Sequence, residues 1–459
     1  MNHWFLILLS ISISISVSGI LRFIVNRYFI NTKPTVYKLP PSPKSIPSIL
    51  NSLHAKLGPI ITIYLGSRPL IFIADRLLAH KALIQNGAVF ANRPPASATQ
   101  PSCAKSFSHS RRWALQVLKN RLASQEKSGQ PICVREHFQY AMFCLLVVIC
   151  FGDNVDENQI KQIEEVQRRV FPRVTKIVLR RRWEEFYQLR KCQLDVSIPL
   201  IRTRKNFQEE DRESMEPHHD RALCYVDTLL SLEFPDEERK INEEEIANLC
   251  SEFLNAGTDT TTTSLEWIMA NLVKYPKIQD RLFMEIKEVV GDGDQEEVSE
   301  SDLKRMPYLK AVVLEGLRRH PPARLLIPHA VMEDVVLNNE YLIPKNAAIN
   351  FLVAEMGWDP EAWEDPLTFK PERFLDHDNG TRQEFDITGS REIKMMPFGA
   401  GRRICPGYQL GMLHLEYYVA NLVCKFEWRA VDGDDVDLSE RTERTMVMKN
   451  PLRVRISPR

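Results

Sequence analysis

One cysteine of this chain stands in a loop whose composition favours chemistry over packing. Cys405 lies in "PFGAGRRICPG", residues 397–407, among three glycines, two arginines and two prolines. Pro406 suits the first position of a helix, so the sequence predicts that Cys405 lies at a helix N-terminus. The free N–H groups and dipole of such a terminus, with Arg402 and Arg403 nearby, favour an anion. The motif therefore predicts a thiol of lowered pKa that serves as a nucleophile or a metal ligand.

The neighbours of Cys405 narrow the chemistry of that thiolate. A nucleophilic cysteine needs a neighbouring base, and no histidine adjoins the motif. A zinc site needs further cysteines or histidines at chelating spacing, and the motif has none. A single thiolate as the axial ligand of haem iron remains, and such ligation favours cleavage of O–O bonds.

A long helix with an unusual centre is predicted from Asn242 to Pro276. Asn242 can cap its start and Pro276 closes the run, while apolar residues recur at helical spacing. Its middle reads "AGTDTTTTS", and glycine and threonine are poor helix formers. A small, hydroxyl-rich notch on an apolar helix indicates that something lies against it. The alternative is a tolerated polar stripe.

Other segments indicate the elements that position these residues. "PIITIYLGSRPLIFIAD" predicts a β-hairpin followed by a helix capped by Asp75. "EHFQYAMFCLLVVICFG", residues 136–152, is apolar almost all round, which favours a buried helix over a second membrane span. In "PYLKAVVLEGLRRHPP", Glu315 and Arg318 are three residues apart and share a face. By themselves they predict a routine surface ion pair.

The N-terminal segment predicts a membrane anchor. Residues 4–21 carry no charge, and a helix of this length is just long enough to span a bilayer. Basic residues follow this run, and the first acidic residue is Asp75, so the remainder is expected on the cytosolic side. A cleaved signal peptide is the alternative. The predicted organisation is an anchor over 1–30, a proline-rich hinge over 31–47 and a catalytic domain over 48–459.

Composition excludes other classes of protein. Lys+Arg and Asp+Glu are 60 each in 459 residues, so the chain has no net positive charge that would attract it to nucleic acid. The nine cysteines include no CxxC pair, so a disulfide framework is not expected and a reducing compartment is favoured.

Four motifs together resemble the cytochrome P450 family. "FGAGRRICPG" is similar to its haem-binding signature at every defining position, namely Phe398, Gly401, Arg403, Cys405 and Gly407. "EGLR" and "PERF" resemble its structural Glu-Arg-Arg triad, and "AGTDTT" resembles its oxygen-activating segment. The motifs occur in the family's order, and the "LPPSP" hinge is similar to plant microsomal (A-type) members, most of all the 89A-type subfamily. The implied fold is mainly α with small β-sheets.

The resemblance implies a role for each matching residue. Cys405 would bind the iron of haem b, and Phe398 would shield its sulfur, with Gly401 in the same signature. Arg403 and His329 match positions that pair with haem propionates. The remaining roles are proton relay during oxygen activation (Asp259, Thr260), a slim helix at the haem face (Ala256, Gly257) and a structural triad (Glu315, Arg318, Arg373).

The implied function is a haem-thiolate monooxygenase on the cytosolic face of the endoplasmic reticulum. It would insert one oxygen atom from O2 into a small apolar substrate. No flavin or nicotinamide fingerprint is present, because Gly399-Ala400-Gly401 is followed by Arg402-Arg403-Ile404. Electrons would therefore come from an NADPH-cytochrome P450 reductase. A haem-thiolate isomerase or dehydratase would not need Asp259 and Thr260, so their presence argues against it.

The N-terminal half departs from the family pattern. Members carry a Trp-x-x-x-Arg helix that holds a propionate, and none of the seven tryptophans here is followed by arginine four residues on. The stretch where this helix belongs is only "ASATQPSCAKSFS". The sequence therefore predicts that part of the N-terminal half is deleted. A membrane-anchored relative that cannot retain haem is the alternative function.

Overall fold

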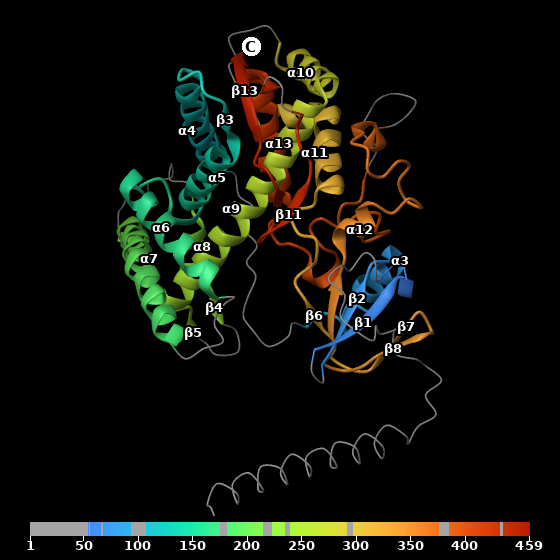
Figure 1. Ribbon diagram of the computed structural model, residues 1–459. Coiled ribbons are helices and arrows are strands. Elements are labelled where there is room, and N and C mark those ends of the chain that lie inside the picture. Colours follow the sequence, from blue (N-terminus) through green and yellow to red (C-terminus); the bar gives the residue numbers. More distant parts are fainter. Residues whose placement is uncertain are drawn as a thin grey trace, which may run out of the picture.

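The chain folds into a mainly helical structure with small sheets (Figure 1), as the sequence predicts. This computed structural model describes residues 54, 56–65, 68–92, 107–174, 181–213, 223–234, 239–291, 297–375, 385–431 and 435–459. The predicted anchor over 1–30 and hinge over 31–47 lie outside these residues, as does the stretch 93–106 where the Trp-x-x-x-Arg helix belongs.

The helices dominate the described chain. They are α3 (Arg76–His80), α4 (Ser108–Glu126), α5 (Val134–Phe151), α6 (Glu157–Val174), α7 (Arg181–Glu213), α8 (Tyr225–Leu230), α9 (Glu243–Lys274), α10 (Pro276–Val290), α11 (Pro307–Arg319), α12 (Val353–Gly357) and α13 (Tyr408–Lys425). Short helical turns are η1 (Lys81–Gln85), η2 (Asp302–Arg305), η3 (Pro371–Phe374) and η4 (Gly401–Arg403).

The strands of the described residues form five small sheets. A four-stranded sheet has the order β1-β2-β9-β6, and a three-stranded sheet has the order β10-β13-β3. Two-stranded sheets pair β11 with β12, β4 with β5, and β7 with β8. The strands are β1 (Ile60–Leu65), β2 (Arg68–Ile73), β3 (Ile132–Cys133), β4 (Glu233–Phe234), β5 (Arg239–Lys240), β6 (His329–Ala330), β7 (Val335–Leu337), β8 (Tyr341–Ile343), β9 (Ala348–Phe351), β10 (Phe426–Ala430), β11 (Glu440–Thr442), β12 (Met446–Met448) and β13 (Arg453–Pro458).

Local sequence signals set several of these boundaries. The Asn242 side chain accepts a hydrogen bond from the backbone N–H of Glu245, and the Glu245 carboxylate accepts one from the backbone N–H of Asn242, so a capping box starts α9. The Asp75 side chain caps α3 in the same way, through the backbone N–H of Leu78. Helix α9 ends at Lys274, just before Pro276 opens α10. These predicted boundaries and the β1–β2 hairpin are confirmed.

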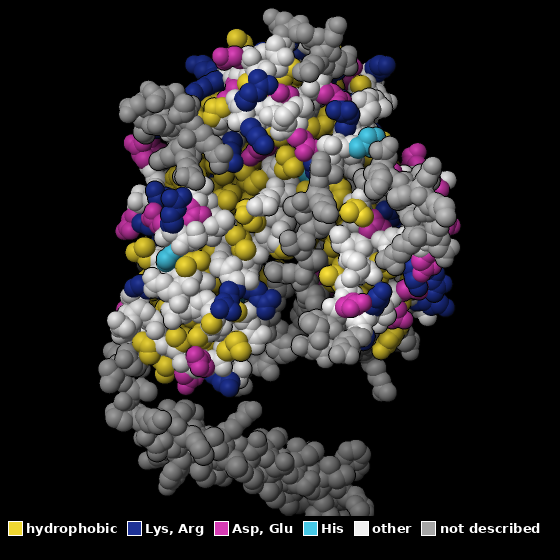
Figure 2. Space-filling view, turned by 180° about the vertical axis from the view of Figure 1, so that it is seen from behind, with side chains coloured by type: hydrophobic (Ala, Val, Ile, Leu, Met, Phe, Trp, Pro, Cys, Tyr) yellow, Lys and Arg dark blue, Asp and Glu magenta, His cyan; other side chains and the backbone are white. Residues whose placement is uncertain are grey.

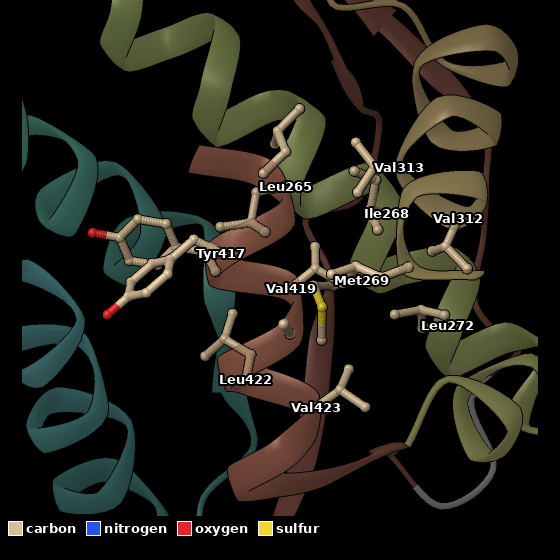
Figure 3. Packing of buried hydrophobic residues seen from close by; sticks show 14 of the residues in the cluster. Leu265, Ile268, Met269, Leu272, Val312, Val313, Tyr417, Val419, Leu422 and Val423 are labelled. Atoms are coloured by element: carbon tan, nitrogen blue, oxygen red, sulfur yellow. The ribbon is translucent and has the colours of Figure 1, made fainter. Parts of the chain in front are cut away.

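Helix α9 crosses the centre of the molecule, between α6–α8 on one side and α11–α13 on the other (Figure 1). Its C-terminal half packs against α11 and α13 in the largest hydrophobic core (Figure 3). The side chains drawn there include Ile268 and Met269 of α9, Val313 of α11 and Val419 of α13, which are at most 1% exposed. Close packing of this kind fixes the direction of α9 and so the place of its polar notch.

Helix α5 confirms the prediction of a buried helix at 136–152. Within the described residues, Val134–Phe151 is the one helix long and apolar enough to cross a membrane, and 72% of it is buried inside the protein. It packs along α9 and α4. The hydrophobic run is therefore explained by burial between neighbouring helices.

Candidate functional site

The loop of residues 397–407 depends on two glycines with left-handed backbone. Gly399 has φ +73° and Gly401 has φ +68°, a region that other residues rarely adopt. A Cβ on Gly401 would lie 2.2 Å from the carbonyl oxygen of Leu83 in η1. The loop therefore presses its backbone against η1, which only glycine permits at this position.

Cys405 lies before α13 and not at its first turn. The helix begins at Tyr408 with Gly407 as N-cap, so the prediction that Pro406 opens the helix is wrong. The backbone N–H of Cys405 donates to the carbonyl of Phe398 at 2.8 Å, which closes the loop on itself. The hydrogen bond therefore fixes the backbone that carries the sulfur.

The thiol of Cys405 is also less acidic than the sequence predicts. Burial raises its pKa, and the backbone N–H of Gly407 lowers it by a smaller amount. The predicted lowering by neighbouring arginines is wrong, because the Arg403 guanidinium bonds elsewhere and Arg402 is exposed. Desolvation of the thiolate thus exceeds the stabilisation that the loop's own N–H supplies.

Phe398 packs over the start of α13. Its ring would lie 3.5 Å from a Cβ on Gly411, and its centroid is 6.3 Å from that of Tyr408. The ring therefore lies within van der Waals reach of Gly411, in the first turn of α13.

Arg403 and His329 both bond to the backbone of one segment. The Arg403 Nε donates to the carbonyl of Ala91 at 2.5 Å, and the His329 Nδ1 lies 2.7 Å from the carbonyl oxygen of Phe90. His329 is 5% exposed and belongs to β6. The structure therefore brings the two predicted propionate partners to the same place, beside residues 90–91.

The polar notch of α9 presents two different faces. Gly257 faces α5, because a Cβ there would lie 2.8 Å from the Leu146 side chain. Its small size serves the helix–helix contact between α9 and α5. Ala256 is exposed, and the Thr260 hydroxyl donates to the Ala256 carbonyl at 2.6 Å. Ala256 and Thr260 are four residues apart and share a face.

The carboxylate of Asp259 bonds to partners from α5 and from the β11–β12 hairpin. Its Oδ1 accepts a hydrogen bond from the Gln139 side chain of α5 at 3.0 Å, and its Oδ2 pairs with Arg444 at 2.9 Å. These partners are 120 and 185 residues away along the chain, and no local pattern signals them. The carboxylate lines a pocket together with Gln139, Glu164, Arg168, Asn255 and Arg444.

Glu315, Arg318 and Arg373 come together as a buried network. Arg318 binds Glu315 through two hydrogen bonds of 2.7 and 2.8 Å, and Arg373 lies 3.4 Å from the same carboxylate. The side chains of Glu315 and Arg318 are 0% exposed. Arg318 also donates to the carbonyls of Gly357 and Pro366. The pair is therefore no surface ion pair, since it joins α11 to the segment around η3.

Comparison with known proteins gives a family and relatives. The family model "Cytochrome P450" matches residues 32–116 and 104–457. Cytochrome P450 89A9 of Arabidopsis thaliana is 44% identical over 526 aligned positions, covering 99% of this chain and 98% of the relative. Cytochrome P450 98A1 of Sorghum bicolor is 29% identical and covers 99% and 96%. The 526 positions exceed the 459 residues here, so the Arabidopsis protein has residues without a counterpart in this chain.

Solved structures agree with the fold. A zebrafish cytochrome P450 with progesterone superposes with a TM-score of 0.70 at 22% identity, over 90% of this chain and all of the other. At this identity the likeness shows the fold alone. The family match and the Arabidopsis relative confirm the resemblance and show that this chain belongs to the cytochrome P450 family, whose members are haem-thiolate monooxygenases that hold haem b through a cysteine.

Proposed function

We propose that Cys405 is the thiolate that binds haem iron and that the chain is a monooxygenase. It would insert one oxygen atom from O2 into a small apolar organic substrate, with electrons from an NADPH-cytochrome P450 reductase. The observation that carries this proposal is the loop of residues 397–407. Its two left-handed glycines and the Cys405–Phe398 hydrogen bond hold one sulfur at the start of α13.

The described residues fit the binding of haem iron by Cys405 better than the binding of the haem propionates. Cys405 is not fully buried, and its loop supplies the Gly407 N–H to the sulfur. A thiolate bound to a cation gains the charge compensation that its surroundings lack. On the other side, Arg403 and His329 would hold the propionates, and each already bonds a backbone carbonyl. Haem, when bound, supplies the oxygen-activating chemistry.

The notch of α9 would supply protons to that chemistry. The Thr260 hydroxyl stands on the same face as exposed Ala256, and its bond to the Ala256 carbonyl orients it. Asp259 would be the carboxyl that passes protons to Thr260, as a general acid does. Glu315, Arg318 and Arg373 would support the structure and do no chemistry.

The location of the protein in the cell is also part of the proposal. Residues 1–30 would anchor it in the endoplasmic reticulum membrane by a single span, with 31–47 as a hinge and 48–459 as the cytosolic catalytic domain. The uncharged run 4–21 and the basic residues after it support this topology.

Figure 2 shows hydrophobic side chains gathered near the centre of the rear face of the described part.

The reduced, carbon monoxide-bound absorbance spectrum of the purified full-length protein tests the monooxygenase assignment. A thiolate-type band would support it, because the band requires both haem and a thiolate ligand. A protein that shows no haem absorbance after expression with excess haem would contradict it.

Thr260→Ala tests the proton role. The variant should keep haem and divert electrons from NADPH to hydrogen peroxide, since the hydroxyl that delivers protons is gone. The product formed per NADPH consumed is the measurement, and Thr261→Ala in the same notch is the matched control. If both variants keep the wild-type ratio, Thr260 has no part in the reaction.

A second candidate function is a membrane-anchored relative that cannot retain haem. The chain has no Trp-x-x-x-Arg motif, and the family model matches in two pieces that overlap at residues 104–116. Charge-assisted hydrogen bonds contribute about 1.5–3 kcal/mol each, so loss of two propionate donors costs about 3–6 kcal/mol. Total stability of a protein is about 5–15 kcal/mol, so this loss can decide whether the holoprotein forms.

Haem content separates the two candidates. We expect the chain as it stands to hold haem weakly, and a version with a Trp-x-x-x-Arg helix inserted between Pro95 and His109 to hold it better. An insert of equal length with alanine in place of both residues is the control. Near-stoichiometric haem in all three proteins would exclude the second candidate.

A further inference from the structure

A pocket lies where α5, α6, α9 and the turn of the β11–β12 hairpin meet. It contains about 370 Å³ of space, including the part at its open mouth, and Phe143 of α5 and Leu254 of α9 form its apolar wall. Thr258 of α9 lines it as well. Successive residues of a helix are about 100° apart around its axis, so Thr258 and Thr260 point to nearly opposite sides of α9. The pocket is therefore separate from the Thr260 side of the helix.

The charged side chains of the pocket lining form two ion pairs. Arg168 binds Glu164 at 2.6 Å within α6, and Arg444 of the hairpin binds Asp259 of α9 at 2.9 Å. An ion that entered the pocket would lose hydration and find each opposite charge already paired. The lining therefore favours a neutral ligand.

The amide of Gln167 gives the pocket a hydrogen-bond donor. Gln167 belongs to α6, lines the pocket and is 5% exposed. Its Oε1 accepts from the Ser251 hydroxyl at 3.0 Å and from the Asn255 amide at 3.2 Å. Two donors meet at this atom, which fixes it as the oxygen and places Nε2 on the other branch of the amide. Among the described residues none accepts a hydrogen bond from Nε2, and a buried donor of this kind needs an acceptor.

Asn255 of α9 adds an acceptor beside this donor. Its Nδ2 donates to the Gln167 Oε1 and, at 3.3 Å, to the Ser251 Oγ. Both donations come from the nitrogen, so the carbonyl oxygen Oδ1 is left as the group that Asn255 offers to the pocket it lines. One donor from α6 and one acceptor from α9 thus stand next to each other over an apolar wall.

We propose that this pocket is a second ligand site, for a small neutral molecule that carries a carbonyl next to an N–H or O–H group, as a primary amide does. The ligand carbonyl accepts from Gln167, its N–H donates to Asn255, and its apolar part contacts Phe143 and Leu254. Such a ligand joins α6 to α9 and is an effector of that contact, separate from the molecule that is oxidised. The proposal goes beyond the proposed function and does not depend on it.

Benzamide is the probe that tests the chemistry of the site. The full-length protein is titrated with benzamide, with benzoate and with acetophenone, and each Kd is measured by ligand-observed NMR. Benzoate has a similar shape and a charge, whereas acetophenone keeps the carbonyl and loses the N–H donor. Benzamide should bind about tenfold more tightly than either, which is the effect expected for one hydrogen bond. No binding of benzamide, or equal binding of the three compounds, would overturn the proposal.

A matched pair of variants tests the place of binding. Gln167→Glu keeps an oxygen for Ser251 and Asn255 and replaces the donor, so it should weaken benzamide about tenfold. Gln193→Glu is the control, because Gln193 of α7 is also buried, at 4% exposed, and does not line the pocket. Thermal unfolding confirms that both variants are folded, and Asn255→Ala should weaken benzamide if Gln167→Glu is not.

Wild-type affinity for benzamide in the folded pocket variants would show that it binds elsewhere and would overturn the proposal, as would an equal loss in Gln193→Glu. The carbon monoxide band plays no part in these measurements. Its absence would contradict the proposed function and leave the test of this pocket unchanged.

Discussion

Two carboxylate–arginine sites of this molecule pair the same kinds of charged group and differ in their surroundings. Glu315 and Arg318 are 0% exposed, and the carboxylate also accepts from the backbone of Lys370. Asp259 and Arg444 are 23% and 43% exposed and are joined by a single ion pair. The first site lies between α11 and η3, whereas the second joins α9 to a hairpin turn.

The difference in burial gives the two sites different uses. A buried charge that loses its partner is uncompensated and costs about 3–5 kcal/mol. A partly exposed pair contributes about 0–1 kcal/mol, because water replaces the lost partner. The Glu315 network can therefore hold the core rigid, while the Asp259 pair can open and close at little cost. The second kind of site suits the proton-handling role proposed for Asp259.

Glu315→Gln is expected to give the largest loss of stability. The amide cannot balance the charges of Arg318 and Arg373, so the free energy of unfolding should fall by about 3–5 kcal/mol. Thermal unfolding of the purified protein measures the effect. Glu364→Gln is the control, since Glu364 is 81% exposed and pairs only loosely with Lys370 at 3.6 Å. Equal shifts in the two variants would contradict the distinction.

An intermediate effect on stability is expected from the titration of His320, which bonds to the first residue of the β11–β12 hairpin. Its ring stacks on Trp267 at 4.0 Å and bonds Glu440 at 3.2 Å. Burial lowers the pKa of His320 from 6.5 to about 4. The unfolded chain therefore binds a proton at a higher pH than the folded protein does, and stability should be lost as pH falls from about 6.5 to about 4.

His320→Phe tests this pH dependence because it keeps an aromatic ring on Trp267 and cannot titrate. The unfolding midpoint of the variant should fall less steeply than that of the wild type between pH 6.5 and 4. Identical slopes would show that other groups cause the acid sensitivity.

The smallest change in stability is expected for Asp259→Asn. Removal of a partly exposed charge should alter the free energy of unfolding by less than about 1 kcal/mol. Thermal unfolding beside Glu315→Gln measures it. A loss as large as that of Glu315→Gln would mean that the Asp259–Arg444 pair is structural, and it would contradict the distinction between the two sites.

Sequence reasoning succeeded where the signal is local. The capping box at Asn242, the Asp75 cap and the buried helix at 136–152 depend on neighbours within a few residues and are confirmed. Helical spacing also put Glu315 and Arg318 on one face, but their burial comes from packing against the segment around η3.

Long-range contacts account for what the sequence did not predict. The partners of Asp259 on α5 and on the hairpin come together only when the chain has folded, and so does the contact of Gly257 with Leu146. At Cys405 the rule for proline at a helix start misplaced the start of α13 by two residues. Burial of the Cys405 thiol, which no sequence pattern signals, raises its pKa by more than the backbone N–H of Gly407 lowers it.

The identity of the haem ligand is tested most directly by the reduced carbon monoxide spectrum of Cys405→Ser, beside that of Cys424→Ser. A neutral hydroxyl cannot replace a thiolate at iron, so the thiolate-type band should vanish in Cys405→Ser. It should remain in Cys424→Ser, whose cysteine lies near the far end of α13. A thiolate-type band of wild-type intensity in Cys405→Ser would show that another residue binds the iron and would contradict the assignment of this loop.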